Sequence, residues 1–206
     1  MPTETFFKLP NEKKNKILEA VKKEIVTAKI EEISIKNIVE EAEIARGSFY
    51  QYFQSKEDMI VYLIEKQMEQ LKQKIEKELQ KCDGEITNVF LTIYDCIIHQ
   101  MVKNKDKKVY AKIFANIKVG EENYFLKPPK EENNHFYEKY IHKENLKISS
   151  EEDFRIIISI FHAITSYSVG HTIKTKEFEK ERQDLIKRLA YIKTGIEKER
   201  GGLNAC

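Results

Sequence analysis

The chain has 206 residues, and its 36 Lys and Arg nearly balance its 34 Asp and Glu, which gives a formal net charge of +2 at pH 7. This length suits one large or two small domains with a sizeable core, and so small a net charge does not by itself indicate a nucleic-acid partner. With 34% charged residues but only 7 Gly and 4 Pro, the composition predicts an all-α protein with few turns.

The sequence also predicts a cytoplasmic protein without a membrane segment. No stretch approaches the roughly 18 apolar residues of a membrane span, and the opening MPTETFFKLPNEKK mixes acids with lysines and lacks the apolar run of a signal peptide. Cys82, Cys96 and Cys206 form an odd number without paired metal-ligand spacing, which is typical of free thiols in a reducing compartment.

The first long helix is predicted over Asn11–Ala28, with Asn11 as its N-cap. Its apolar stripe, with spacings of four, four and three, consists of Ile17, Val21, Ile25 and Ala28. This stripe is expected to close a core over the helices that follow. The apolar residues just before the helix, Phe6, Phe7 and Leu9, could pack on the same domain or form a loose arm, and we favour packing.

Two short helices with a tight connection come next, in the order of a helix-turn-helix. The first begins after Ser34, whose hydroxyl can cap it, and ends near Ala42. The second runs from about Ala45 to Phe53, with Phe49 and Phe53 on its inward face. Its outward side chains can all form hydrogen bonds: Arg46, Ser48, Tyr50, Gln51 and Gln54. Such a face suits a DNA major groove, where Arg bonds guanine and Gln bonds adenine, but an amphipathic helix facing water has the same composition.

The run ARGSFYQYFQSKE, residues 45–57, resembles the signature of the TetR family of bacterial transcriptional regulators. The shared pattern is Gly, a small hydroxyl residue, an apolar residue and Tyr, then an aromatic residue and Phe, then Ser, Lys and Glu. Two positions depart from it, because Glu43 stands where the turn usually has Gly, and Ala45 where Ser usually caps the recognition helix. A non-Gly residue in a left-handed turn costs on the order of 1–2 kcal/mol and a missing cap about 1 kcal/mol, so the fold can still form. Glu43 is expected to point away from DNA phosphates.

The resemblance implies a three-helix DNA-binding domain over residues 1–55, joined to a larger helical ligand-binding and dimerisation domain over residues 56–206. A symmetric homodimer would present two recognition helices to a palindromic double-stranded operator. Carried over by position in the motif, the expected DNA-binding residues are Ser34, Arg46, Gly47, Ser48, Tyr50, Gln51 and Lys56. Within this set, Arg46, Ser48 and Gln51 are candidates for base contacts, and Ser34, Tyr50 and Lys56 for phosphate contacts.

Beyond the motif, Ser55 and Asp58 form a capping-box pattern that predicts a long helix from Lys56 to about Leu79, which Asp83-Gly84 ends. Five further helices are predicted, near Glu85–Lys103, Lys105–Lys118, Glu131–His142, Glu151–Thr172 and Phe178–Glu199. The stretch Val119–Lys130 holds one Gly and two Pro, so we expect a loop there, either a lid over a pocket or a plain connector.

The predicted helix Glu151–Thr172 carries apolar residues all round its circumference. A helix without a polar face must be covered on more than one side, which favours a partner subunit. The last helix adds a narrower apolar seam, made of Leu185, Leu189, Ile192 and Ile196. In the family that the chain resembles, the last two helices of each subunit form a four-helix dimer interface, so we expect a homodimer through them.

Aromatic and aliphatic residues of the body are core residues by default, and only the family resemblance suggests that some of them surround a small, largely apolar effector. The candidate ligand-binding residues are Phe90, Tyr94, Ile97, His99, Met101, Phe114, His162 and Ser166. Effector binding is expected to tilt the helix Lys56–Leu79, change the spacing of the recognition helices and release DNA, as in a repressor.

An enzyme is the first alternative, but the sequence lacks GxxxxGK[ST], GxSxG, HExxH and CxxC motifs. His135 and His142, seven apart, could share a helix face, yet their spacing supplies no further zinc ligands. No metal or other cofactor is therefore expected. The second alternative is a helical protein-interaction module without sequence-specific DNA binding, which the departures at Glu43 and Ala45 leave open.

Overall fold

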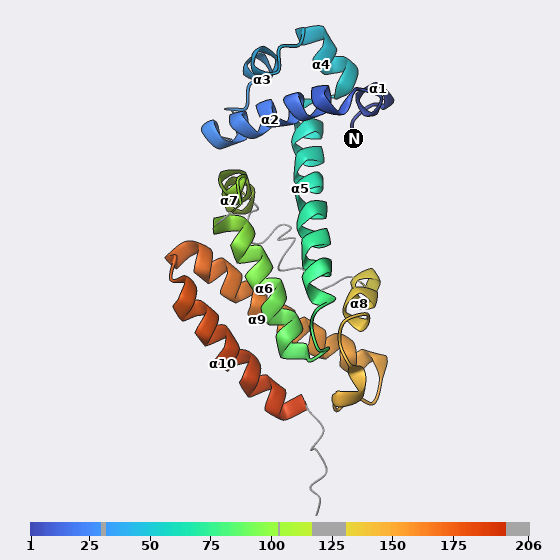
Figure 1. Cartoon of the computed structure of the whole chain (residues 1–206), viewed down its shortest axis with the longest axis vertical. Coiled ribbons are helices and arrows are strands. Elements are labelled where there is room, and N and C mark those ends of the chain that lie inside the picture. The colour runs from blue at the N-terminus through green and yellow to red at the C-terminus, as the bar shows by residue number, and fades with distance from the viewer. Residues whose placement is uncertain (30–31, 103, 117–130, 197–206) are drawn as a thin grey trace, which may run out of the picture. The chain divides into compact units, whose positions relative to one another are not determined.

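The computed structural model describes residues 1–29, 32–102, 104–116 and 131–196, and for residues 113–116 and 131–134 it describes the backbone alone. Within these ranges the regular elements are helices, so the all-α class predicted from composition is confirmed (Figure 1). The chain divides into two compact units. Met1–Gln73 and Gln100–Ile117 form the first unit, and Lys74–His99 with the described residues after 118 form the second.

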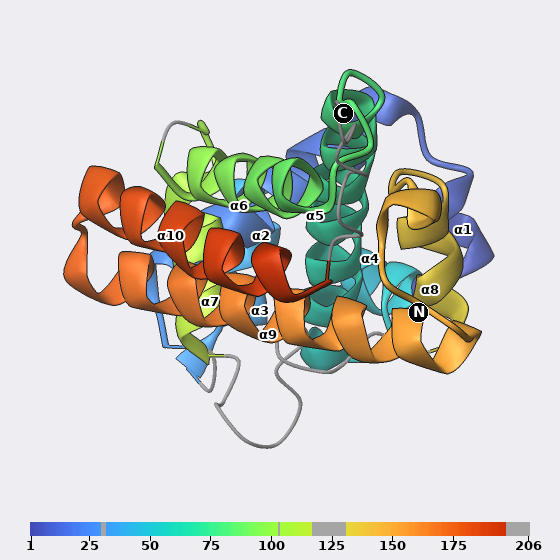
Figure 2. The same cartoon turned by 90° about the horizontal axis from the view of Figure 1, so that it is seen from below.

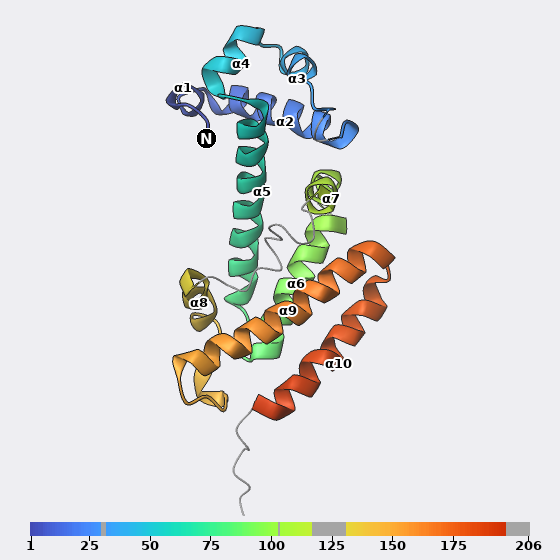
Figure 3. The ribbon, with the colours of Figure 1, turned by 180° about the vertical axis from the view of Figure 1, so that it is seen from behind.

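The first unit consists of α1 (Glu4–Phe7), α2 (Asn11–Thr27), α3 (Ile35–Glu41), α4 (Arg46–Tyr52), most of α5 (Lys56–Leu79), the end of α6 (Ile86–Val102) and α7 (Lys107–Asn116). The second consists of the rest of α5 and α6, α8 (Glu131–Glu138), the 3-10 helix Lys143–Asn145, α9 (Glu151–Thr175) and α10 (Phe178–Ile196). In opposite views, α3 and α4 lie on the same side of α2, as a helix-turn-helix requires (Figures 1 and 3).

Most predicted helix ends are confirmed. Ser34 caps α3, Ser55 Oγ accepts the backbone N–H of Asp58 at the start of α5, and Gly84 ends the following turn with φ +79°. The N-cap predicted for α2 is wrong, because Asn11 is already helical and Pro10 is the N-cap, with no side-chain hydrogen bond. Proline suits a helix start, where its missing N–H costs nothing.

Two elements of the body differ from the prediction. α8 ends at Glu138 rather than His142, because the chain turns at Tyr137–Ile141 and then forms the 3-10 helix Lys143–Asn145. α9 continues to Thr175, three residues beyond the predicted end, and stops where Lys176 adopts a left-handed conformation with φ +62°. The predicted loop Val119–Lys130 lies outside the described residues.

The core of the first unit joins α1, α2, α3, α4, α5 and α7. Its fully buried side chains include Phe6, Ile17, Val21, Ile38, Phe49, Phe53, Met59 and Leu63. The packing that we favoured for the segment before α2 is confirmed for Phe6, which lies inside this core beside Phe53, and for Leu9, which packs against the core. Phe7 is instead 48% exposed. α7 contributes Val109 to the same core. The inner faces of α3 and α4 are thus held by α2 and α5.

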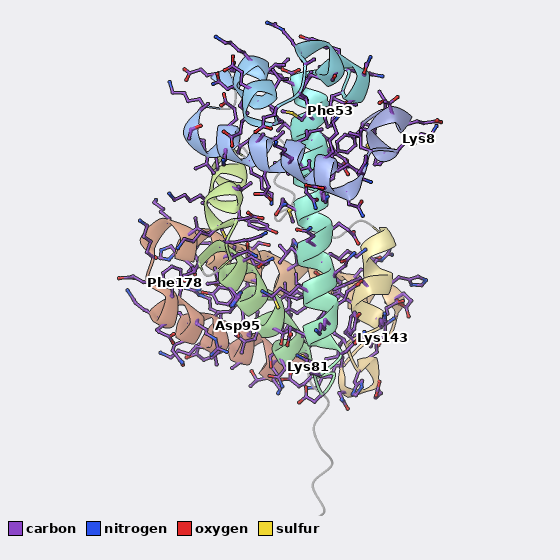
Figure 4. The ribbon with its side chains drawn as sticks, turned by 45° about the horizontal axis from the view of Figure 1, so that its top comes forward. Lys8, Phe53, Lys81, Asp95, Lys143 and Phe178 are labelled. Atoms are coloured by element: carbon purple, nitrogen blue, oxygen red, sulfur yellow. The ribbon has the colours of Figure 1, made fainter. Side chains whose placement is uncertain are left out.

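In the second unit, α9 and α10 run side by side, which the view from below shows most clearly (Figure 2). Ser150 and Asp153 form a full capping box at the start of α9. Asp95 of α6, labelled in Figure 4, accepts two hydrogen bonds of 2.8 Å from Arg182 of α10. This bidentate pair fixes the register of α10 against α6.

α9 corrects one expectation from the sequence, because its 25 residues have a mean hydropathy of 1.3 over the best window and could cross a membrane by length and composition. Phe154, Ile158 and Phe161 are nevertheless fully buried inside the second unit. A core helix of a globular domain has the same composition, so α9 indicates packing and not a membrane.

Candidate nucleic-acid interface

The first helix of the helix-turn-helix, α3, is anchored at its start from two sides. Ser34 Oγ accepts the backbone N–H of Asn37 at 3.4 Å, and Glu24 of α2 accepts the backbone N–H of Ser34 at 2.9 Å. The same carboxylate receives the Asn37 side-chain amide at 3.2 Å to each oxygen. Glu24 is 8% exposed, and these donors offset the cost of burying its charge. Glu24 was not among the residues predicted for the site, although an acid inside the apolar stripe of α2 is a usable signal in the sequence.

The turn between α3 and α4 has the left-handed geometry that its length demands. Glu43 adopts φ +52°, which a residue with a Cβ adopts only at a cost. Its carboxylate lies 2.5 Å from Lys16 Nζ on α2. The hydrogen bond and charge of Lys16 lower the pKa of Glu43, so the carboxylate is ionised and paired at neutral pH. The negative charge of the turn is thereby neutralised within the protein.

The recognition helix α4 separates apolar from polar side chains. Phe49, Tyr52 and the C-cap Phe53 are buried, while the exposed positions are Arg46, Gly47, Tyr50 and Gln51, with Ser48 half-buried between them. The structure therefore brings together on one surface the polar residues that the motif singled out. Ala45 makes no side-chain cap bond, as its missing hydroxyl predicts.

The guanidinium of Arg46 gives this surface a positive charge that favours an anionic partner. Arg46 has no hydrogen bond or ion pair within the part of the chain that the structure describes, so its five donors are available for a base edge. Of the phosphate candidates, Tyr50 is exposed, and Ser34 and Lys56 are half-buried. The Ser34 hydroxyl already accepts a cap bond, but it keeps a hydrogen that it can donate to a phosphate.

The candidate ligand-binding residues fall in different environments. Phe90, Tyr94 and Ile97 are buried along one face of α6, where Phe90 stacks on Tyr137 and the Tyr94 hydroxyl bonds Thr172 at 2.7 Å. On α9, Ser166 and His162 are half-buried, and burial lowers the pKa of His162, so this imidazole is neutral at pH 7.

The remaining candidates are His99, Met101 and Phe114. His99 is exposed, and its Nδ1 lies 2.9 Å from Lys74 Nζ. Met101 is half-buried and belongs to the first unit, while the Phe114 side chain lies outside the described residues. Of the two histidines weighed as zinc ligands, His135 pairs with Glu138 at 2.8 Å. Within the described ranges no three His, Cys, Asp or Glu residues are grouped for a metal.

A buried inner face and a polar, exposed outer edge on the second of two short helices are the features of a DNA-binding helix-turn-helix protein. Two family models match the chain. The model for bacterial regulatory proteins of the tetR family matches residues 17–63, and the model for tetracyclin repressor-like C-terminal domains matches residues 85–196. The chain belongs to the TetR family and is a transcriptional regulator that binds DNA through its N-terminal domain. No curated protein matches the chain.

Several solved structures have the same fold. A TetR family transcriptional regulator from Chloroflexus aurantiacus J-10-FL is 20% identical, with a TM-score of 0.51 over 96% of this chain and 99% of that one. The fatty acid degradation regulator FadR from Bacillus halodurans is 16% identical, with a TM-score of 0.50 over 84% and 97%. The dihydroxyacetone kinase operon activator DhaS is 20% identical, with a TM-score of 0.50 over 90% and 98%. At these identities the likeness concerns the fold alone.

Proposed function

We propose that the protein is a cytoplasmic, ligand-responsive repressor that binds a palindromic operator as a homodimer and is released by a small, largely apolar effector. Residues 1–55 would read the DNA, and residues 56–206 would bind the effector and the second subunit. The observation that carries the proposal is the polar edge of α4, where Arg46, Tyr50 and Gln51 are exposed above a buried apolar face. That division of faces is what insertion into a major groove needs.

Within this proposal the candidate DNA-binding residues of α4 and its neighbours have two roles, base contact and phosphate contact. Arg46 donates two hydrogen bonds to a guanine edge, Gln51 donates and accepts on an adenine edge, and Ser48 adds a shorter contact from the half-buried side. Gly47 lets the backbone approach the groove because it has no side chain, and the open space at its Cβ position means that the packing of the protein does not itself require glycine there. Ser34, Tyr50 and Lys56 bind phosphates and hold the register.

The dimer is supported by apolar side chains left uncovered on the last two helices. Ile156, Ile160 and Tyr167 lie along one side of α9 at spacings of four and seven, and Tyr191 lies on α10. Large apolar groups exposed in a row cost free energy in water, and a second copy of α9 and α10 would cover them. Two-fold symmetry then places two recognition helices on one duplex.

The effector proposal is supported by neutral polar groups set among aromatic ones. Thr165 Oγ1 on α9 is buried and makes no hydrogen bond to any described residue, which is costly unless a ligand or a water satisfies it. Thr165 lies one turn from Phe161, whose ring contacts Phe90. His162, neutral at pH 7, occupies the same turn of α9. Such lining suits an apolar molecule with an uncharged hydrogen-bonding group.

A continuous set of hydrogen bonds supports coupling between α6 and the helix-turn-helix. Lys22 of α2 binds Asp106 at 2.7 Å, the backbone N–H of Asp106 donates to Asn104, and Asn104 donates to Gln100 of α6. Gln100 donates to Tyr110 of α7, which in turn donates to a carbonyl of α5. A shift of α6 on effector binding would move these partners and with them α2.

The experiment is selection from a randomised duplex pool with the purified chain, followed by footprinting on the selected sequence. We expect an enriched palindrome with half-site centres about 10 bp, or a multiple of it, apart. Transcription from a promoter that carries this site then gives the sign of regulation, and repression is expected. A pool that stays random after repeated rounds would contradict operator binding.

A further inference from the structure

The C-terminal end of the recognition helix is held by a residue from the beginning of the chain. The last four carbonyls of any helix lack partners within it. In α4, the Gln51 carbonyl accepts a hydrogen bond of 2.6 Å from Thr3 Oγ1, and the Tyr52 carbonyl accepts one of 2.9 Å from the Thr3 backbone N–H. A single residue 48 positions away in sequence thus satisfies two of these carbonyls.

Thr3 is itself fixed, because it is the N-cap of α1. Its Oγ1 accepts the backbone N–H of Phe6 at 3.4 Å while it donates to Gln51. Phe6 is fully buried, with its ring centroid 4.9 Å from that of Phe53 and 5.4 Å from that of Tyr62. Residues 2–9, here called the N-terminal clip, are therefore packed between the end of α4 and the start of α5.

α4 needs such support more than most helices. It has only seven residues, and its N-cap Ala45 supplies no side-chain hydrogen bond. A helix of two turns is unstable by itself and depends on tertiary contacts. The family match for the DNA-binding domain begins at residue 17, so the N-terminal clip lies outside the matched segment.

We propose that the N-terminal clip positions the recognition helix, with Thr3 as the positioning residue, and thereby sets operator affinity without touching DNA. Gln51 is a proposed base contact, and its backbone carbonyl is bonded by Thr3. Loss of this hydrogen bond would make the end of α4 more mobile and displace the Gln51 side chain from its base. The inference rests on the proposed operator binding. The exposed Lys8, the C-cap residue of α1, pairs only with Glu4 among the described residues, at 3.1 Å, and takes no part in this positioning.

Three substitutions at one position separate positioning from simple capping. Thr3→Val removes both functions of the hydroxyl. Thr3→Asp keeps an acceptor for capping α1 but cannot donate to the Gln51 carbonyl, and Thr3→Ser restores both. We expect Thr3→Val and Thr3→Asp to weaken binding to the selected operator by about 5- to 20-fold, the equivalent of one to two hydrogen bonds, and Thr3→Ser to bind like the parent.

Two further readouts identify the cause. If the N-terminal clip only positions α4, the dependence of affinity on salt stays that of the parent in the uncharged variants Thr3→Val and Thr3→Ser and in Lys8→Gln, because no phosphate contact is lost. The amides of Tyr52 and Phe53 should exchange faster with solvent in Thr3→Val and Thr3→Asp without DNA present. This readout is independent of operator binding, so failure of the proposed function and failure of this inference are distinguishable.

Two outcomes would overturn the inference. Unchanged affinity and unchanged amide exchange in Thr3→Asp would mean that the donated bond does not hold α4. A shallower salt dependence in Lys8→Gln would mean that the segment binds DNA as an arm. If Thr3→Val fails to fold, Thr3→Asp carries the test, because it retains the α1 cap.

Discussion

Lys22 Nζ of α2 lies 2.7 Å from Asp106 Oδ2, and the two side chains are only 12% and 14% exposed. Both belong to the first unit, yet they are 84 positions apart in sequence. Because Asp106 precedes α7 and follows α6, the pair ties the helix-turn-helix to the connection between these helices. Because this ion pair is partly buried, we expect it to affect both the stability of the protein and the pH dependence of that stability.

Asp106→Asn should destabilise the protein more than the loss of an exposed ion pair does. The variant leaves Lys22 in its partly buried site with Glu19 as its remaining partner, so we expect a loss of about 1–3 kcal/mol in the free energy of unfolding. The matched control is Glu41→Gln, which removes an exposed ion pair with Lys23 and should cost less than about 1 kcal/mol. Urea unfolding of both variants measures the difference, and equal losses would contradict this role of the pair.

The same pair predicts a pH dependence of stability. Burial alone lowers the pKa of Lys22, but hydrogen bonds and charges from Asp106 and Glu19 outweigh it, and the pKa is raised. A lysine with a higher pKa in the folded than in the unfolded state adds stability that is fully present below about pH 10.4 and is lost as the pH rises through the folded pKa. The urea concentration at the midpoint of unfolding should therefore fall less at alkaline pH in Asp106→Asn than in the parent protein. An identical fall in both proteins would contradict a raised pKa of Lys22 due to Asp106.

Glu43→Gly and Glu43→Ala together measure the strain in the turn. Both remove the pair with Lys16, but only glycine relieves the φ of +52°. Glycine also adds freedom to the unfolded chain, which offsets part of this gain, and we expect Glu43→Gly to be more stable than Glu43→Ala by about 1 kcal/mol. Thermal unfolding of the two variants gives this difference directly. Equal stabilities would mean that the turn is not strained.

Ile156→Glu should separate the proposed dimer. Ile156 is 50% exposed on α9, and a carboxylate there would have to be desolvated in a subunit interface. Val61→Glu on α5 is the matched control, since Val61 is 49% exposed and lies outside the last two helices. Sedimentation should give a monomer for Ile156→Glu and a dimer for Val61→Glu. Two dimers of equal stability would place the interface elsewhere.

Arg46→Ala and Lys56→Ala should differ in what they do to DNA binding. Arg46→Ala is expected to relax the preference for one base pair by about 1–3 kcal/mol. Lys56→Ala is expected to weaken all sequences alike and flatten the dependence on salt by about one phosphate contact. Titrations against the selected operator and its single-base variants distinguish the two. Equal loss on every sequence for Arg46→Ala would exclude a base contact.

Sequence reasoning succeeded where the signal is local. The Ser34 cap, the buried Phe49 and Phe53, and the helix beginning at Lys56 all follow from residues a few positions apart. The left-handed turn at Glu43 was implied by the family resemblance instead. Periodicity and capping depend on neighbours within one or two turns, so they can be recognised in the sequence alone.

Contacts between distant segments could not be predicted in this way. Thr3 binds the end of α4, Glu24 binds the start of α3, and Lys22 binds Asp106. Each of these side chains also has an ordinary local interpretation as a cap or a solvated charge, and only the packing of the helices assigns its partner. The same applies to Thr165, whose buried hydroxyl is known only once α9 is placed against its neighbours.

The most direct test is a stoichiometric titration of the selected operator duplex with the parent protein, repeated over a range of salt concentrations and on a duplex with scrambled half-sites. We predict two protomers per operator, a steep loss of affinity with salt and a preference for the operator of about 10³-fold or more. Equal affinity for operator and scrambled duplexes, or no saturable binding at low salt, would contradict the claim that the exposed edge of α4 reads DNA.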